Sequence, residues 1–163
     1  MTTLPDYSTL FAVTRVVPLR FLVRDGSNFV HDIQFLSGYL HDGRTTKGDV
    51  QLRRGRLDIK VMRDCWELGY KEHADSLELY TTISKLTISP VSSIRWEAAD
   101  LQLFDRNLSI EAIYVGPDHW ERRDRSELVI SAPSGGWRLC IRLADHFAKI
   151  QLVDLRKPSL KKQ

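Results

Sequence analysis

The sequence predicts an α+β domain of mostly antiparallel strands, arranged as a curled sheet, a sandwich or a barrel-like meander, with one amphipathic helix at about residues 29–41. Three observations support this class. Alternation of apolar and polar residues, the period of a half-buried strand, recurs along most of the chain. The links between the alternating segments are short and rich in turn residues. Only one segment has a helical period, so the helical crossovers of a parallel α/β fold are not expected.

The predicted helix follows from the spacing of its apolar residues. These stack on one face at i, i+4, i+7 and i+11: Phe29, Ile33, Leu36 and Leu40. Asp32 lies at the border of this apolar stripe. Ser27 or Asn28 can cap the first turn, and Gly43 is placed to end the helix.

The strands are expected to pair as hairpins. Residues 50–53 and 57–61 flank a turn at Arg54–Arg56. A strand at 77–83 follows, and a slip of the apolar period near Ser84 and Lys85 indicates a bulge or a turn.

Two further groups of strands complete the expected fold. Residues 100–105 and 108–115 form another hairpin. Residues 128–132, 137–143 and 148–153 alternate in the same way, and their tight links predict a three-stranded meander.

The chain is expected to form a single globular domain over residues 1–155, followed by a frayed basic tail at 156–163. Its 163 residues can bury a core without metal or disulfide staples. The apolar fraction of 42% and the charged fraction of 28% are those of a globular protein, so disorder of the whole chain is not expected.

A cytoplasmic location is expected. The first residues lack the basic region that precedes the apolar run of a signal peptide. No apolar stretch approaches the ~18 residues of a membrane span. Cys65 and Cys140 lie far apart in the sequence, which favours two free thiols in a reducing compartment.

A polar cluster is predicted where the second hairpin strand ends. Continuing the alternation of residues 57–61 places Arg63 and Cys65 inward. A buried arginine needs a carboxylate partner, and Asp32 is the first choice. Two interpretations remain open: a polar pocket of Asp32, Arg63, Cys65 and Glu67 in a small hydrolase or ligand-binding enzyme, or a structural tie between helix and sheet.

Other catalytic motifs are missing from the sequence. It contains no G-x-S-x-G, P-loop or dinucleotide fingerprint. The doublets His31-Asp32 and His41-Asp42 cannot share a metal, because His31 and Asp42 would lie about 16 Å apart along the helix. No metal and no cofactor are therefore expected.

The segment from Gly116 to Ser126 is predicted to be a surface loop, because it is too polar for a core strand. Trp120 lies in its middle, beside Arg122 and Arg123. Either the tryptophan folds back over the end of the sheet, or the three residues contact a protein partner or a second copy of the chain, since Trp and Arg are enriched at binding hot spots.

Nucleic-acid binding is a third alternative. The net charge is only +3, from 24 basic and 21 acidic residues, although basic clusters occur at 53–56, 122–125 and 156–162. Arg138, Arg142 and Lys149 would share the wet face of the last hairpin. Basic residues at turns and strand edges also keep a β protein soluble. The leading hypothesis is therefore a non-enzymatic binding or protein-interaction module, followed by the enzyme and then by weak nucleic-acid binding.

Overall fold

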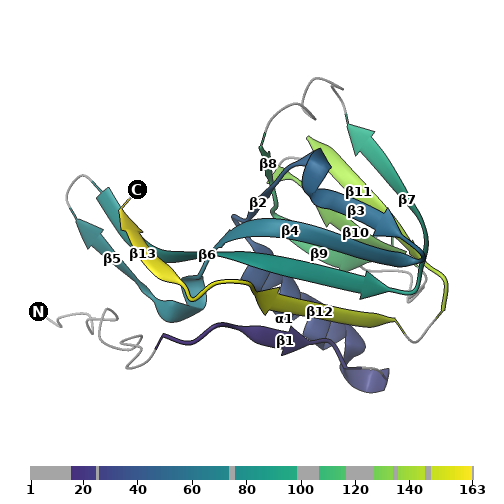
Figure 1. Cartoon of the computed structure of the whole chain (residues 1–163), viewed down its shortest axis with the longest axis horizontal. Coiled ribbons are helices and arrows are strands. Elements are labelled where there is room, and N and C mark those ends of the chain that lie inside the picture. Colours follow the sequence, from purple (N-terminus) through teal and green to yellow (C-terminus); the bar gives the residue numbers. More distant parts are fainter. Residues whose placement is uncertain are drawn as a thin grey trace, which may run out of the picture.

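The computed structural model describes residues 16–24, 26–73, 76–98, 107–116, 127–133, 136–145 and 148–162. It contains two antiparallel sheets and one α-helix (Figure 1). The predicted class, mostly antiparallel β with one helix, is confirmed, and the sheets do not close into a barrel.

The larger sheet runs in the order β1-β12-β6-β4-β2-β8, with three more strands paired to β4 and β6. Its strands are β1 (Arg20–Leu22), β2 (Arg44–Thr45), β3 (Val50–Arg53), β4 (Arg56–Asp64), β5 (Tyr70–His73), β6 (Ser76–Ser89), β8 (Leu108–Ser109), β12 (Lys149–Asp154) and β13 (Ser159–Lys162). The smaller sheet runs in the order β7-β11-β10-β9. Its strands are β7 (Val91–Ala98), β9 (Ala112–Val115), β10 (Glu127–Ser131) and β11 (Trp137–Leu143).

Among the described residues, helix α1 (Phe29–Leu40) is accompanied by three 3-10 turns, η2 (Gly26–Asn28), η3 (Lys47–Asp49) and η4 (Trp66–Leu68). The predicted apolar stripe of α1 is buried and packs against β4 and β9. Within the described residues, no helix has the length and apolar character needed to cross a bilayer.

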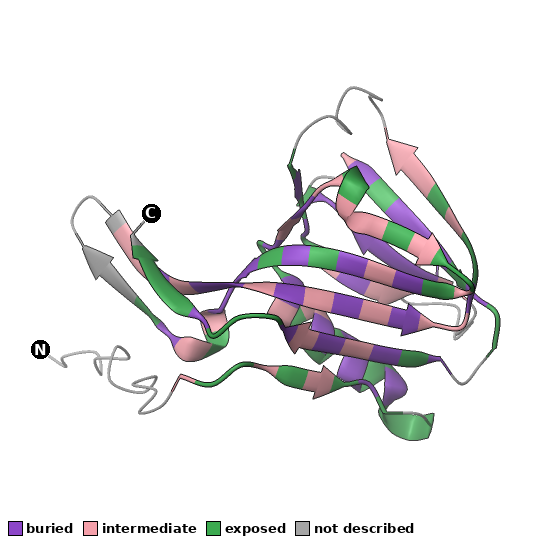
Figure 2. Ribbon diagram, viewed as in Figure 1, coloured by how far each residue is buried: buried purple, intermediate pink, exposed green. Residues whose placement is uncertain are grey.

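One apolar core lies between the two sheets and the helix. Each sheet contributes the inward residues of its strands to this core. Figure 2 shows buried and more exposed residues alternating along β4 and β6. The strands were predicted from the same pattern, in which apolar and polar side chains alternate every second residue.

The two ends of α1 differ from the expectation. Asn28 makes no side-chain cap, because η2 already continues the chain into the helix. The left-handed residue after the helix is Asp42, at φ 61°, and not Gly43. Gly43 is instead needed for space, because a Cβ there would lie 2.7 Å from the Leu40 carbonyl oxygen and 2.9 Å from Val61 Cγ1.

The first predicted hairpin is confirmed. β3 and β4 pair through a two-residue turn in which Arg54 has φ 50° and Gly55 has φ 75°. Positive φ at both turn residues matches the right-handed twist of the strands.

The predicted bulge at Ser84 and Lys85 is wrong. β6 pairs in register with β4 and β12 across both residues. Ser84 occupies an inward position and is fully buried, so a buried hydroxyl interrupts the apolar period while the backbone continues unbroken.

The predicted strand at 108–115 is two strands in different sheets. Ile110 N–H donates to the Gly43 carbonyl oxygen at 2.7 Å, whereas Glu111 N–H donates to the Ser131 carbonyl oxygen at 2.8 Å. Consecutive residues therefore join the larger and the smaller sheet. Its expected hairpin partner, residues 100–105, lies outside the described residues.

The predicted meander is correct for two strands and wrong for the third. β10 and β11 pair antiparallel, as expected. β12 leaves this sheet and lies between β1 and β6 in the larger one. The alternation placed its buried residues correctly, but it carries no information about which strand lies alongside.

An arm, which we define as β5, residues 76–81 of β6, and β13, extends from the larger sheet (Figure 1, left). β5 lies in a stretch for which the sequence predicted no strand, and it pairs with β6. β13 pairs with the other edge of β6, so Ser159–Lys162 of the basic tail is a strand rather than a frayed end.

Candidate functional site

A buried ion pair lies at the centre of the larger sheet. Arg63 points inward from β4 and its side chain is 0% exposed, as the alternation predicted. Its Nε donates to Asp154 Oδ1 at 3.1 Å and its Nη2 to Asp154 Oδ2 at 3.0 Å. The prediction of a carboxylate partner is confirmed, but the partner is Asp154 of β12 and not Asp32.

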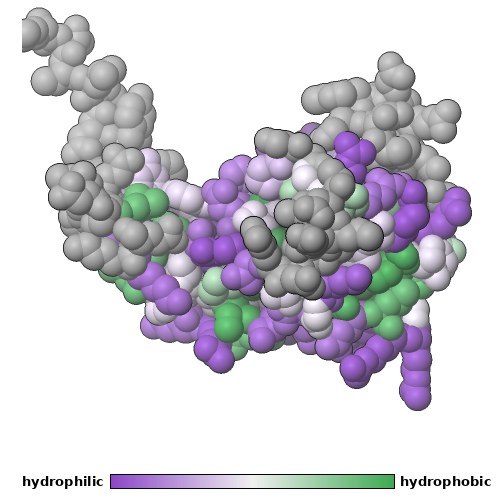
Figure 3. All heavy atoms as spheres, turned by 90° about the horizontal axis from the view of Figure 1, so that it is seen from above, coloured by the Kyte–Doolittle hydropathy of each residue, from purple (hydrophilic) through white to green (hydrophobic). Residues whose placement is uncertain are grey.

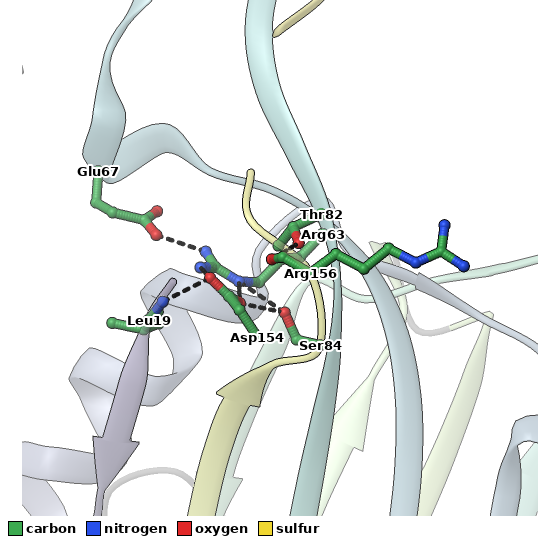
Figure 4. A network of polar contacts seen from close by, with 7 residues as sticks. All are labelled: Leu19, Arg63, Glu67, Thr82, Ser84, Asp154 and Arg156. Atoms are coloured by element: carbon green, nitrogen blue, oxygen red, sulfur yellow. Dashed lines mark hydrogen bonds and ion pairs between the residues drawn. The ribbon is translucent and has the colours of Figure 1, made fainter. Parts of the chain in front are cut away.

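The Asp154 carboxylate is saturated with hydrogen bonds (Figure 4). Besides the two from Arg63, it accepts one from Ser84 Oγ at 2.6 Å and one from Leu19 N–H at 2.7 Å. These four bonds match the roughly four lone-pair sites of a carboxylate. The group therefore ties β4, β6, β12 and the residue before β1 together, which favours the structural interpretation.

Glu67 is the outermost member of the same network. It belongs to η4, and its Oε1 accepts a hydrogen bond from Arg63 Nη1 at 2.7 Å. Its side chain is 27% exposed, whereas Arg63 and Asp154 are at 0%. Figure 4 shows the Arg63 guanidinium between the two carboxylates. Glu67 is thus the point at which the buried network reaches the surface.

Asp32 belongs to a different ion pair. It accepts from Arg24 N–H at 2.8 Å and from Arg24 Nε at 2.9 Å, and its other oxygen meets Arg24 Nη2 at 2.9 Å. The hydrogen bonds from the Arg24 side chain and backbone lower the pKa of Asp32 to about 2. Asp32 therefore fixes the chain before the helix to its first turn.

Cys65 is placed inward, as predicted, and is fully buried. Burial raises the pKa of its thiol to about 12. The thiolate is the nucleophilic form, so this environment does not suit a catalytic cysteine.

We expect neither cysteine of the native protein to react readily with a thiol reagent at neutral pH, because Cys65 and Cys140 are both free and buried. Mixing with Ellman's reagent before and after denaturation measures this. Both thiols should react only after unfolding. Rapid labelling of Cys65 in the folded protein would show that its thiol is accessible and reactive, which contradicts its buried placement.

A cleft of about 480 Å³ opens on the outer side of helix α1. It is lined by His31, Gln34, Phe35, Gly38, Tyr39 and Glu67. The rings of His31 and Phe35 meet edge to face, with 4.8 Å between centroids, and Phe35 is 51% exposed. We call this the α1 cleft. It joins an apolar helix surface to the exposed end of the buried ion network.

Sequence reasoning did not single out the α1 cleft, although one signal was present. At about 100° per residue, Phe35 projects on the side of the helix away from the apolar stripe. A large aromatic side chain at that position is expected to be exposed, as Phe35 is. The contribution of Glu67 depends on the placement of η4, which sequence spacing does not give.

The predicted contact residues Trp120, Arg122 and Arg123 lie outside the described residues, and their contact with a partner stays a prediction. The face seen in Figure 3 is mostly hydrophilic where residues are described, with hydrophobic side chains in small separate groups.

The described basic clusters do not form one surface. The cluster at 53–56 lies at the β3–β4 turn, near residue 88 of β6, whereas Lys161 pairs with Leu79. Nine residues of a strand separate these two points by about 30 Å. Lys149 also lies in a different sheet from Arg138 and Arg142. The described residues therefore do not favour nucleic-acid binding.

Comparison with protein-family models, with curated proteins and with solved structures found no match to this chain. Among the described residues, no three His, Cys, Asp or Glu side chains gather in a way that could hold a metal ion. The two His-Asp doublets are not joined, because Asp32 pairs with Arg24 and Asp42 with His41.

Proposed function

We propose that this chain is a non-enzymatic protein-binding module of the cytoplasm, and that a partner binds in the α1 cleft. The observation that carries the proposal is the half-exposed Phe35 ring beside this cleft. The cytoplasmic location is supported by the two free, buried cysteines, which are typical of a reducing compartment.

Phe35 offers a large gain on binding. A phenylalanine can bury roughly 200 Å². Covering the exposed half would therefore contribute about 2 kcal/mol, at ~25 cal/mol per Å² of apolar area. The edge-to-face contact with His31 holds the ring in place before binding, which reduces the entropy lost on association.

The enzyme alternative has less support. It requires Asp32, Arg63 and Cys65 to act in one pocket, but Asp32 is bound to Arg24, Arg63 to Asp154, and the Cys65 thiol is buried. Groups that satisfy one another inside the fold are not available to a substrate.

Gly38→Met is expected to abolish binding without harming the fold. A Cβ added at Gly38 meets no described atom within 4 Å, and methionine is a better helix former than glycine. The side chain would therefore fill the cleft while stabilising α1. Peptides selected on the wild-type protein by phage display should lose about tenfold or more in affinity, measured by isothermal titration calorimetry.

Phe35→Ser should weaken the same peptides, and Leu160→Ser is the matched control. Leu160 is 49% exposed, an exposed fraction similar to that of Phe35, but it lies on β13 in the arm. Loss of binding with the first two variants and retention with the third supports the proposal. Selected peptides that bind all three variants as tightly as the wild type would overturn it.

A further inference from the structure

We infer that the α1 cleft accepts a basic side chain, arginine or lysine, presented by a segment of the partner polypeptide. This inference depends on the proposed function and adds the chemistry of the occupant. Three features of the cleft favour a cation: the charge balance of the buried network, the end of the helix, and two aromatic rings.

The buried network of Arg63, Asp154 and Glu67 contains one more negative charge than positive charge. Asp154 and Glu67 contribute two carboxylates, and Arg63 contributes one guanidinium. Asp154 already pairs with Arg63 through two hydrogen bonds. The surplus therefore lies at Glu67, the one member of the three that is exposed, and it lies at the wall of the cleft.

The C-terminal turn of α1 adds to this negative potential. A helix of this length carries about half a negative elementary charge at its C-terminus. Gly38 and Tyr39 of the last turn line the cleft. All of α1 is described, and its last turn contains no basic side chain that would offset this charge.

The aromatic lining suits a cation as well as an apolar chain. Phe35 and Tyr39 both line the cleft, and a cation over an aromatic ring is attracted by its negative face. The buried Arg63 guanidinium lies 6.0 Å from the Tyr39 centroid, at the outer limit of a cation–π contact. The alkyl stem of lysine or arginine would cover Phe35 while its charge reaches Glu67.

The same geometry disfavours the other side chains. An acidic side chain would be repelled by Glu67 and by the helix end. A neutral apolar side chain would take water away from Glu67 without adding a counter-ion, so that Glu67 and Asp154 would still share the single Arg63 guanidinium, and burying an incompletely balanced carboxylate is costly. A basic side chain is the class that satisfies the apolar and the charged parts of the cleft together.

The test uses short peptides that differ at one central position, which is arginine, lysine, citrulline, norleucine or glutamate. Titration of the ¹⁵N-labelled full chain by NMR should give shifts at residues 31–39 and at Glu67 with the two basic peptides. We expect the arginine peptide to bind about five- to thirtyfold more tightly than its neutral isostere citrulline.

Two variants identify the charge that is responsible. Glu67→Gln keeps an acceptor for Arg63 but removes the surplus charge, and it should abolish the preference for arginine over citrulline. Glu97→Gln is the control, because Glu97 also pairs with an arginine, Arg95, but lies on β7 in the other sheet. It should keep the preference. Thermal denaturation checks that both variants fold. Gly38→Met should block the binding of every peptide, whether or not Glu67→Gln changes the preference for arginine.

The outcomes separate this inference from the proposed function. Equal affinity for arginine, citrulline and norleucine peptides in the cleft would overturn the inference and leave the binding function standing. A preference for arginine that survives Glu67→Gln would also overturn it. Shifts that avoid the cleft for every peptide, or no shifts at all, would overturn both.

Discussion

Replacement of Arg63 by methionine is expected to lower the free energy of unfolding by about 3–5 kcal/mol, because it leaves a buried carboxylate without its counter-ion. The Asp154 side chain is 0% exposed, so water does not take over the role of the arginine. Two hydrogen bonds to Asp154, one to Ser84 and one to Glu67 are lost as well. Urea denaturation followed by circular dichroism measures the loss.

The double variant Arg63→Met with Asp154→Asn shows whether the unpaired charge of Asp154 or the lost hydrogen bonds account for most of the lost stability. Asparagine removes the orphaned charge but can still accept the hydrogen bond from Leu19 N–H. We expect it to recover about 1–3 kcal/mol of the stability lost in the single variant. A single variant as stable as the wild type, or a double variant less stable than Arg63→Met alone, would contradict the account of a buried ion pair.

Replacement of Gly43 by alanine is the second change with a large expected effect. We expect it to lower the free energy of unfolding by about 2–3 kcal/mol, the cost of overpacking a rigid site. The added methyl would lie 2.7 Å from the Leu40 carbonyl oxygen, which accepts a hydrogen bond from Gly43 itself, and 2.9 Å from the buried Val61. Neither neighbour can withdraw without breaking a contact.

Gly38→Ala is the matched control for this prediction. It makes the same chemical change in α1, where a Cβ meets no described atom within 4 Å. It should raise the free energy of unfolding by about 0.5–1 kcal/mol through helix propensity. Equal effects of the two substitutions in thermal denaturation would show that space at Gly43 is not the constraint.

The fold class and the buried faces could be predicted from the sequence, because the period of a strand or helix is a local property. The stripe of α1 and the inward residues of β4 follow from spacing alone. The neighbours of each strand could not be predicted in this way. Residues 148–153 alternate equally well as a third meander strand or as the strand between β1 and β6, and only packing of the whole chain decides.

The site was predictable in part for the same reason. The inward position of Arg63 followed from alternation, whereas its partner is 91 residues away. A signal was nevertheless present. Asp154 lies at the next buried position after Ile150 and Leu152, and Ser84 lies at the buried position two residues before Leu86. Polar residues in buried phases on separate strands indicate that those strands meet.

The position of β12 also determines when the larger sheet can be completed during synthesis. Among the described residues, β12 is the strand that pairs with β1. The paired residues, 20–22 and 151–153, lie far apart in the sequence. β1, the first strand among the described residues, therefore emerges from the ribosome long before its partner exists. Contacts at such sequence separation carry a loop-closure cost before they contribute, and they slow folding. Until residue 154 is available, β6 has an open edge, and Arg63 lacks the carboxylate that its buried position requires.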